Sequence, residues 1–460
     1  MRVLPSAGLV LSLVLVRGLV AEVFTEQKVA ATGPSYSFGG IVSVDGGTAV
    51  SRHATNRFSG ASETVVLERS RKGWEIKSVT NERETGTPFV AQGDEIIYQD
   101  VRSLHVYRRE RGEWRKVQTL EVTQNPVDYF DFWALTVAGD RMAALGRFQQ
   151  AVTLNLVTKL FIFRKMDGMW KKEHEILEDP AQGFVSLAMA SDSLDQRLMA
   201  LVQSNNAEER WHLRIYRFDF QGSTNLVQTI VPPPVELKDS LTGTQIAMDG
   251  QWAMVGNGQI NNGNGAVYMY RLEGIGPPEV WELQQVIRPD APMEDGFGSS
   301  IALAGDKLLV GAPARNERQH KAGAAFLFEV KYNPDITVTW LERRKFVASD
   351  GQPGDRFGQW VSFSDDTYAI GAPGPFGKEG GAIYFFEELP EVKVKRVANG
   401  KLRVFWPLKH GNSRLEMSSS VGGDWQAADF PRWAETMMWV MELPPDRAAG
   451  FFRVQRDAAD

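Results

Sequence analysis

The chain contains no cysteine among its 460 residues. This absence excludes disulfide bonds, cysteine-ligated zinc, cysteine-ligated iron–sulfur clusters and thioether-bound haem. A folded protein of this length without cross-links must be stabilised by its core alone. The remaining composition, 43% hydrophobic and 23% charged, is that of a globular protein.

Histidine is scarce as well, and the six histidines show no metal-binding pattern. No two of them have the i, i+4 spacing of a helical zinc site. No nucleophile elbow or glycine-rich phosphate loop leads from a strand into a helix. Acidic pairs such as Asp365 and Asp366 occur, but sequence alone does not bring two acids to one cleft. We therefore predict a protein that is not an enzyme, with no cofactor and no metal site. The histidines are His53, His105, His174, His212, His320 and His410.

Basic runs and long apolar runs are also missing. The formal net charge is −6, and about −8 if Arg2 and Arg17 are removed with an N-terminal leader. A mildly acidic chain without a basic run lacks the positive surface charge of proteins that bind nucleic acids or anionic membranes. The apolar stretch 7–16 is too short to span a bilayer, and no later run is long enough. We expect neither a nucleic-acid partner nor a membrane-spanning segment.

Residues 1–21 have the pattern of a secretory signal peptide. Arg2 provides the positive start, 7–16 the apolar core, and Gly18 and Ala21 the small residues before a cleavage point. An uncleaved amphipathic start is the alternative. We expect a secreted protein located in the periplasm, at the cell surface or in the medium. The lack of disulfides favours a bacterial envelope protein over an animal ectodomain.

Internal repetition is the strongest pattern in the sequence. The segments FGSSIALAGDKLLVGAP (297–313) and FGQWVSFSDDTYAIGAP (357–373) share a frame in which Phe precedes a later Gly by 14 positions. Seven copies of one structural unit are therefore predicted. The weaker copies are 38–54, 85–100, 131–146, which needs one inserted residue, 184–202 and 242–258.

Each copy continues with an alternating segment that ends near a charge. Period-two alternation indicates a half-buried strand. A fourth segment then usually opens with tryptophan, which we interpret as packing between units rather than as a ligand cage. Four short strands per unit are typical of a β-propeller blade. The third segments are 63–69, 104–110, 159–165, 212–218, 265–271, 323–329 and 381–387, and the tryptophans are Trp74, Trp114, Trp170, Trp281 and Trp340.

The seventh copy stops after its third strand, at Glu387. A strand at 22–30, with Phe24 in the tryptophan position, can replace the missing fourth strand. Such pairing would remove an open sheet edge, which invites aggregation. We therefore predict an all-β fold in which 22–387 is a seven-bladed β-propeller closed by the N-terminal strand.

Residues 388–460 are predicted to form a separate module. Alternating runs at 401–408, 414–428 and 450–456, with Gly and Pro turns, indicate a small β-sandwich-like domain. The pattern resembles a short C-terminal module found on many secreted proteins of environmental bacteria. Sorting, surface attachment and capping of the propeller all remain open as its role.

The paired motifs at 297–313 and 357–373 resemble FG-GAP repeats, which form the propeller of integrin α subunits and occur widely in bacterial surface proteins. The resemblance implies a seven-bladed ring, extracellular placement, and recognition or adhesion rather than chemistry. Many FG-GAP repeats wrap calcium in an Asp/Asn-rich loop between their first two strands. Here the turns at 248–251, 304–307 and 364–367 are of hairpin length, so we expect no calcium there.

The loops between second and third strands vary in length, and binding residues concentrate on such loops over a rigid scaffold. We predict a monomeric recognition scaffold that binds a protein or glycan through 257–265, 314–323 and 374–380. The alternative is a hydrolase or lyase acting on a polysaccharide. No apolar periodicity requires burial of 314–323, so we expect that loop to be exposed and tolerant of replacement. The candidate binding residues are Asn261, Asn262, Asn264, Arg315, Asn316, Glu317, Arg318, His320, Lys321, Lys378 and Glu379.

Overall fold

The computed structural model describes most of the chain from Phe24 to Arg456. The predicted signal peptide over 1–21 lies outside the described residues, as do Arg318 and the tips of several loops. The described residues are 24–31, 38–54, 62–70, 73–79, 89–99, 103–121, 129–149, 156–177, 182–191, 196–204, 211–218, 224–230, 244–273, 279–289, 294–317, 319–335, 337–375, 378–388, 392–397, 401–407, 413–418, 426–428, 432–435, 438–443 and 451–456.

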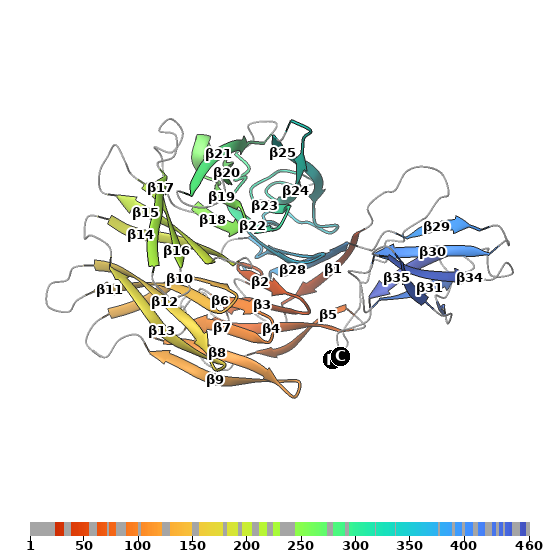
Figure 1. Cartoon of the computed structure of the whole chain (residues 1–460), viewed down its shortest axis with the longest axis horizontal. Coiled ribbons are helices and arrows are strands. Elements are labelled where there is room, and N and C mark those ends of the chain that lie inside the picture. The colour runs from red at the N-terminus through yellow and green to blue at the C-terminus, as the bar shows by residue number, and fades with distance from the viewer. Residues whose placement is uncertain are drawn as a thin grey trace.

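Strands dominate these residues, and the single helix among them is the short α1 (Ile260–Gly263). From Phe24 to Glu388 the described strands form seven four-stranded antiparallel sheets (Figure 1). Six sheets use four consecutive strands. These are β2 (Val42–Asp45), β3 (Thr48–Ala54), β4 (Ser62–Ser70) and β5 (Gly73–Val79); β6 (Phe89–Gln92), β7 (Glu95–Gln99), β8 (Ser103–Glu110) and β9 (Glu113–Glu121); β10 (Tyr129–Ala138), β11 (Arg141–Gln149), β12 (Leu156–Met166) and β13 (Met169–Leu177); β14 (Gln182–Ser191), β15 (Gln196–Ser204), β16 (Trp211–Phe218) and β17 (Thr224–Ile230); β18 (Thr244–Asp249), β19 (Trp252–Asn257), β20 (Ala266–Glu273) and β21 (Val280–Ile287); β22 (Ser300–Ala304), β23 (Lys307–Ala312), β24 (Ala324–Tyr332) and β25 (Val338–Phe346).

The remaining sheet combines the two ends of this region. It contains β26 (Trp360–Ser364), β27 (Thr367–Ala372), β28 (Ala382–Glu388) and the N-terminal strand β1 (Phe24–Ala30). β1 pairs antiparallel with β28, from Phe24 opposite Glu388 to Ala30 opposite Ala382. Phe24 is buried, and its ring meets Phe346 edge to face at 5.3 Å between centroids. The predicted pairing of 22–30 with the last repeat is confirmed for Phe24–Ala30.

The first strand of each sheet lies beside the first strand of the next, and β26 lies beside β2. Side-chain hydroxyls join these inner strands where backbone groups do not pair directly. Ser43 Oγ accepts a hydrogen bond from Ala91 N at 3.1 Å, and Ser362 Oγ accepts one from Val44 N at 3.0 Å. The second of these bonds joins the last sheet to the first. Sheets arranged radially in this way form a β-propeller.

The turns between first and second strands are short. β22 and β23 pair Ala304 with Lys307, which leaves two residues in the turn. Gly305 has a φ of +55°, the left-handed conformation that suits a tight hairpin. The turns at 248–251 and 364–367 have the same length. The hairpin length predicted for these three turns is confirmed.

The tryptophans that open the fourth strands pack between sheets, as predicted. Gln285 Oε1 accepts a hydrogen bond from Trp340 N at 2.9 Å, and Gln285 Nε2 donates to Trp340 O at 3.3 Å. Each such pair of bonds joins the outer strands of neighbouring sheets and satisfies two backbone groups. Equivalent pairs of bonds join Gln27 to Trp74, Gln118 to Trp170 and Gln228 to Trp281, and all four tryptophans are buried.

Two further sheets follow Glu388 and are drawn apart from the propeller in Figure 1. They share one core, which includes Val404, Trp406, Leu415 and Val454. The strands predicted from the alternating runs of this region are therefore present. Their bounds are β29 (Lys393–Arg396), β30 (Leu402–Pro407), β31 (Ser413–Ser418), β32 (Gln426–Ala427), β33 (Arg432–Glu435), β34 (Met438–Leu443) and β35 (Phe451–Arg456).

Candidate binding surface

Each well-described loop between a second and a third strand binds the segment that opens the next sheet. A glycine at the end of the loop forms a parallel bridge with the phenylalanine of the following FG motif. The three loops predicted to bind a partner therefore occupy equivalent places on successive sheets. The bridges are Gly265–Phe297, Gly323–Phe357 and Gly381–Phe38.

Close backbone contact explains the glycines of the repeated motif. A Cβ on Gly311 would overlap the carbonyl oxygen of Gly358 in the next sheet. A Cβ on Gly323, whose φ is +89°, would overlap the carbonyl oxygen of Phe357. Only glycine tolerates both the contact and the left-handed backbone at low cost. The motif is thus the surface along which neighbouring sheets meet.

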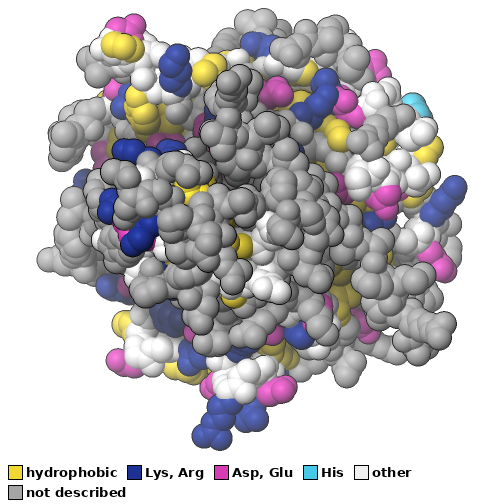
Figure 2. All heavy atoms as spheres, turned by 90° about the vertical axis from the view of Figure 1, so that its right-hand side faces the viewer, with side chains coloured by type: hydrophobic (Ala, Val, Ile, Leu, Met, Phe, Trp, Pro, Cys, Tyr) yellow, Lys and Arg dark blue, Asp and Glu magenta, His cyan; other side chains and the backbone are white. Residues whose placement is uncertain are grey.

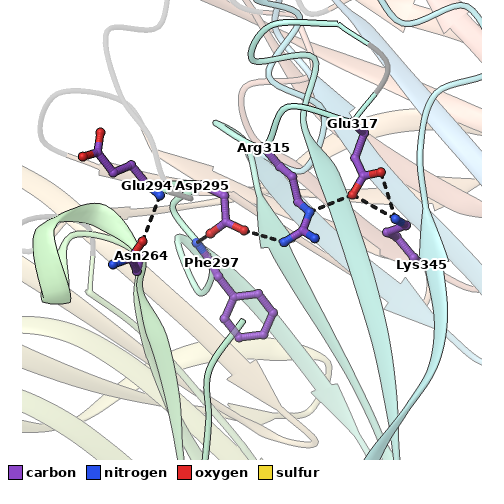
Figure 3. A network of polar contacts seen from close by, with 7 residues as sticks. All are labelled: Asn264, Glu294, Asp295, Phe297, Arg315, Glu317 and Lys345. Atoms are coloured by element: carbon purple, nitrogen blue, oxygen red, sulfur yellow. Dashed lines mark hydrogen bonds and ion pairs between the residues drawn. The ribbon is translucent and has the colours of Figure 1, made fainter. Parts of the chain in front are cut away.

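We call the contact between the fifth and sixth sheets the glycine seam, because Gly296 N donates to Gly263 O there at 2.9 Å. A chain of charges lies beside it (Figure 3). Asp295, which is 0% exposed, accepts from Phe297 N at 3.1 Å and pairs with Arg315 at 2.7 Å. The chain of contacts continues from Arg315 through Glu317 to Lys345, with distances of 2.7 Å and 2.8 Å.

These contacts correct the expectation that the whole of 314–323 is exposed and replaceable. Arg315 and Glu317 are half-buried, and each is bound by opposite charges. Burial works to raise the pKa of the Glu317 carboxyl, but hydrogen bonds and charges from Lys345 and Arg315 outweigh it, so the pKa lies below its ordinary value. Asn316 Oδ1 also accepts from Lys321 N at 2.7 Å. This part of the loop stabilises the fold, since its polar groups are already paired.

The other predicted residues divide into three groups. Asn264 Oδ1 accepts from Glu294 N at 2.9 Å and so fixes the loop, as Figure 3 shows. The side chain of Asn261 and the whole of Arg318 lie outside the described residues. The exposed candidates that remain for recognition are Asn262, Asn316, His320, Lys321, Lys378 and Glu379.

The contact between the sixth and seventh sheets carries a residue that the sequence prediction missed. Here Arg356 N donates to Lys321 O at 3.2 Å, at the place of the Gly296–Gly263 bond, and we call this contact the cationic seam. Arg356 is half-buried, and its Nε donates to Gly374 O at 3.1 Å. Aligning GDRFG (354–358) with EDGFG (294–298) would have shown that an arginine replaces a glycine.

Metal ligands, surface charge and membrane spans were the remaining features predicted from the sequence for the described part of the chain. No group of three or more His, Asp or Glu side chains there is close enough to hold a metal ion. On the face shown in Figure 2, acidic and basic side chains of the described residues are interspersed. No helix among the described residues is both long and apolar enough to cross a membrane.

Comparison with known proteins agrees with the repeat pattern. No curated protein matches the sequence. Among solved structures, the chain is similar to Sqt1 from Chaetomium thermophilum (10% identity, 81% of this chain and 82% of that one, TM-score 0.45). It is also similar to the WD40 domain of SCAP from fission yeast (9% identity, 79% and 98%, TM-score 0.40). The fold assignment rests on sheet topology rather than on these structures. A model of the FG-GAP repeat matches residues 281–328 and 340–386, so the chain carries FG-GAP repeats on a β-propeller.

Proposed function

We propose that the chain is a binding protein whose propeller presents the loops 257–265, 314–323 and 374–380 to a protein or glycan. The observation that supports this is that these loops expose polar side chains while hydrogen bonds to the next sheet hold their backbone in place. His320 is exposed, yet its carbonyl accepts from Gly354 N at 2.9 Å in the next sheet. Loops held in this way lose little conformational entropy when they bind, which favours affinity.

The proposal extends to location and chemistry. FG-GAP repeats are typical of extracellular proteins, which supports a secreted protein in the periplasm, at the surface or in the medium. A monomeric state is part of the same proposal. The proposal includes neither catalysis nor a cofactor, metal or nucleic-acid partner. A polysaccharide hydrolase or lyase is the competing function. New reducing ends or unsaturated products after incubation with polysaccharides would favour that enzyme.

The seven sheets are proposed to be the blades of one closed ring over 22–387, with 388–460 as a separate module. Contact of β26 with β2 supports this, as does the 2.9 Å hydrogen bond from Ser364 Oγ to Asp45 Oδ1. Because the chain has no cysteine, the double variant Asp45→Cys/Ser364→Cys can be cross-linked cleanly. Rapid disulfide formation in the folded protein supports the ring. The control is Asp45→Cys/Asp249→Cys, in which the two cysteines lie on distant sheets and should oxidise slowly. If Asp45→Cys/Ser364→Cys oxidises no faster than this control, the ring is contradicted.

Binding is tested with a loop variant, Gln319→Ser/His320→Ser/Lys378→Ser, beside a matched control on the outer strands, Lys171→Ser/Glu282→Ser. All five residues are exposed. Each protein is immobilised and probed with a glycan array and with purified envelope proteins. We expect the wild type and the control to retain a specific ligand that the loop variant loses at unchanged melting temperature. Equal retention by all three proteins, or no specific ligand for any, would contradict the proposal.

A further inference from the structure

The two seams have the same backbone and different charges. In the glycine seam the backbone hydrogen bond joins Gly263, with a φ of +84°, to Gly296, with a φ of +69°. In the cationic seam the same bond joins Lys321, with a φ of +52°, to Arg356, with a φ of +56°. Two adjacent cations therefore occupy left-handed positions where the sister seam has glycine.

That conformation has a cost for both side chains. A left-handed backbone costs about 1–2 kcal/mol at a residue with a Cβ, and glycine avoids most of it. Arg111 and Asp167 have a similar φ in hairpin turns, so the comparison with the glycines of the sister seam, rather than the strain alone, distinguishes Lys321 and Arg356. The backbone hydrogen bond of the seam does not require a cation, because Gly263 and Gly296 form the same bond, and the Arg356 side chain adds one bond, to Gly374 O.

The cations of this seam also lack the carboxylates that pair with Arg315 in the sister seam. In the glycine seam Arg315 pairs with Asp295 and with Glu317. Among the described residues, neither Lys321 nor Arg356 has an ion-pair partner, and the only side-chain hydrogen bond of Arg356 goes to the backbone carbonyl of Gly374. Burial without an anion lowers the pKa of the Arg356 guanidinium. A desolvated cation in this state gains most from an anionic ligand.

The two loops that meet at this pair carry further polar residues. Gly354 N donates to His320 O, which holds 320 and 321 against the segment that contains Arg356. His320 and Lys378 are exposed, and neither has an ion-pair partner among the described residues. A guanidinium can grip a carboxylate or sulfate with two parallel hydrogen bonds, and an ammonium adds a point charge. Asp355 and Glu379 lie next to Arg356 and Lys378 in the sequence, so the two cations of the joint, Lys321 and Arg356, are the groups that fit a ligand with repeated anionic groups.

We infer that the cationic seam binds an anionic polysaccharide bearing carboxylate or sulfate groups. This inference rests on the proposed function and names its ligand class. An anionic polysaccharide suits the seam because its carboxylate or sulfate groups recur along the polymer and can meet the guanidinium of Arg356 and the ammonium of Lys321 together. An acidic protein segment is the alternative, and binding to polyglutamate tests it.

The test uses Lys321→Gly/Arg356→Gly, which gives the cationic seam the residues of its sister. Glycine suits the positive φ at both positions, so the variant removes two charges without straining the fold. The matched control, Lys171→Gln/Lys331→Gln, removes two exposed charges from other strands. Binding to polygalacturonate, dextran sulfate, neutral dextran and polyglutamate is measured by biolayer interferometry on the full chain.

The wild type and the control are expected to bind polygalacturonate or dextran sulfate, with affinity that falls as salt rises, and to ignore neutral dextran. The Lys321→Gly/Arg356→Gly variant should bind at least about tenfold more weakly, as expected for lost charge-assisted hydrogen bonds. Equal affinity of the variant would overturn the inference. Equally tight binding of polyglutamate would replace the glycan by an acidic protein segment.

Failure of this inference can be told apart from failure of the proposed function. If no anionic polymer binds while the loop residues still retain another ligand, the inference falls and the proposed function stands. If the loops retain nothing in either experiment, both fall.

Discussion

The glycine seam and the cationic seam place charge differently around the same backbone joint. In the first, Asp295 and Glu317 neutralise Arg315 and Lys345 in a continuous chain of ion pairs. In the second, the joint itself carries Lys321 and Arg356, and neither has a carboxylate partner among the described residues. A buried charge stabilises a fold only when it is paired, because desolvation is costly.

The comparison therefore separates cations that stabilise the fold from cations that we propose to bind a ligand. Arg315 and Lys345 belong to the fold. Removing Arg315 would leave the buried Asp295 without an ion-pair partner among the described residues, and removing Lys345 would leave Glu317 with one cation in place of two. The joint at Lys321 and Arg356 does not depend on their charges, because glycines form the same joint in the sister seam, and Arg356 adds one side-chain bond, to Gly374 O. We propose that their cations serve a ligand.

The largest expected effect lies in what the seams share. Gly265→Ala and Gly323→Ala should each lower the free energy of unfolding by about 3 kcal/mol or more, because each Cβ would overlap a backbone carbonyl at a left-handed position. Urea unfolding measures the loss. The control Gly305→Ala, at +55° with no atom within 4 Å of the new Cβ, should lose only about 1 kcal/mol. Equal losses at all three positions would show that backbone contact does not define the seams.

The next effect distinguishes the seams by their aspartates. Asp295→Asn should cost about 2 kcal/mol, because it removes a buried hydrogen-bonded charge from Arg315. Asp355→Asn, at the equivalent position, should cost less, since Asp355 accepts from Gln352 N and has no cation partner among the described residues. Urea unfolding at neutral pH measures both variants. A larger loss for Asp355→Asn would break the comparison.

A smaller effect depends on pH. Burial opposes ionisation of Glu317, but Lys345 and Arg315 outweigh it and hold the folded pKa below the ordinary value of 4.5. A carboxylate with a lowered pKa stabilises the fold above its unfolded pKa, and that contribution is lost as pH falls through the folded pKa. Glu317→Gln should therefore lower the free energy of unfolding at neutral pH. The difference in this free energy between the variant and the wild type should shrink below about pH 4. A difference that stays constant would mean that the ion pairs contribute nothing.

Much of the fold was predictable because the repeated residues are those that pack one sheet against the next. The FG and GAP glycines were visible at 297–313 and 357–373, and alternation located the third strands. The residue that the copy at 131–146 needed is a β-bulge, where the register of β10 shifts between Phe132 and Ala134. The last repeat has only three strands in the sequence. Counting strands per repeat therefore predicted that the N-terminal strand, β1, completes the last sheet.

The charges of the surface were less predictable. Arg315 pairs with Asp295, 20 positions earlier, and Glu317 with Lys345, 28 positions later. No local sequence pattern links residues this far apart, so the sequence predicted an exposed loop at 314–323. Arg356 was missed for another reason, since the motif was aligned from Phe357 onward and the preceding residue fell outside it.

One measurement tests the separation of the two seams most directly, namely the urea-unfolding free energy of Lys321→Gly/Arg356→Gly without ligand. The account predicts a value equal to that of the wild type, or higher by up to about 1–2 kcal/mol, because glycine relieves the left-handed backbone and two uncompensated cations are removed. Arg315→Gln/Lys345→Gln, measured alongside, should lose stability. A loss of about 2 kcal/mol or more in the Lys321→Gly/Arg356→Gly variant would contradict the account, because those cations would then belong to the fold.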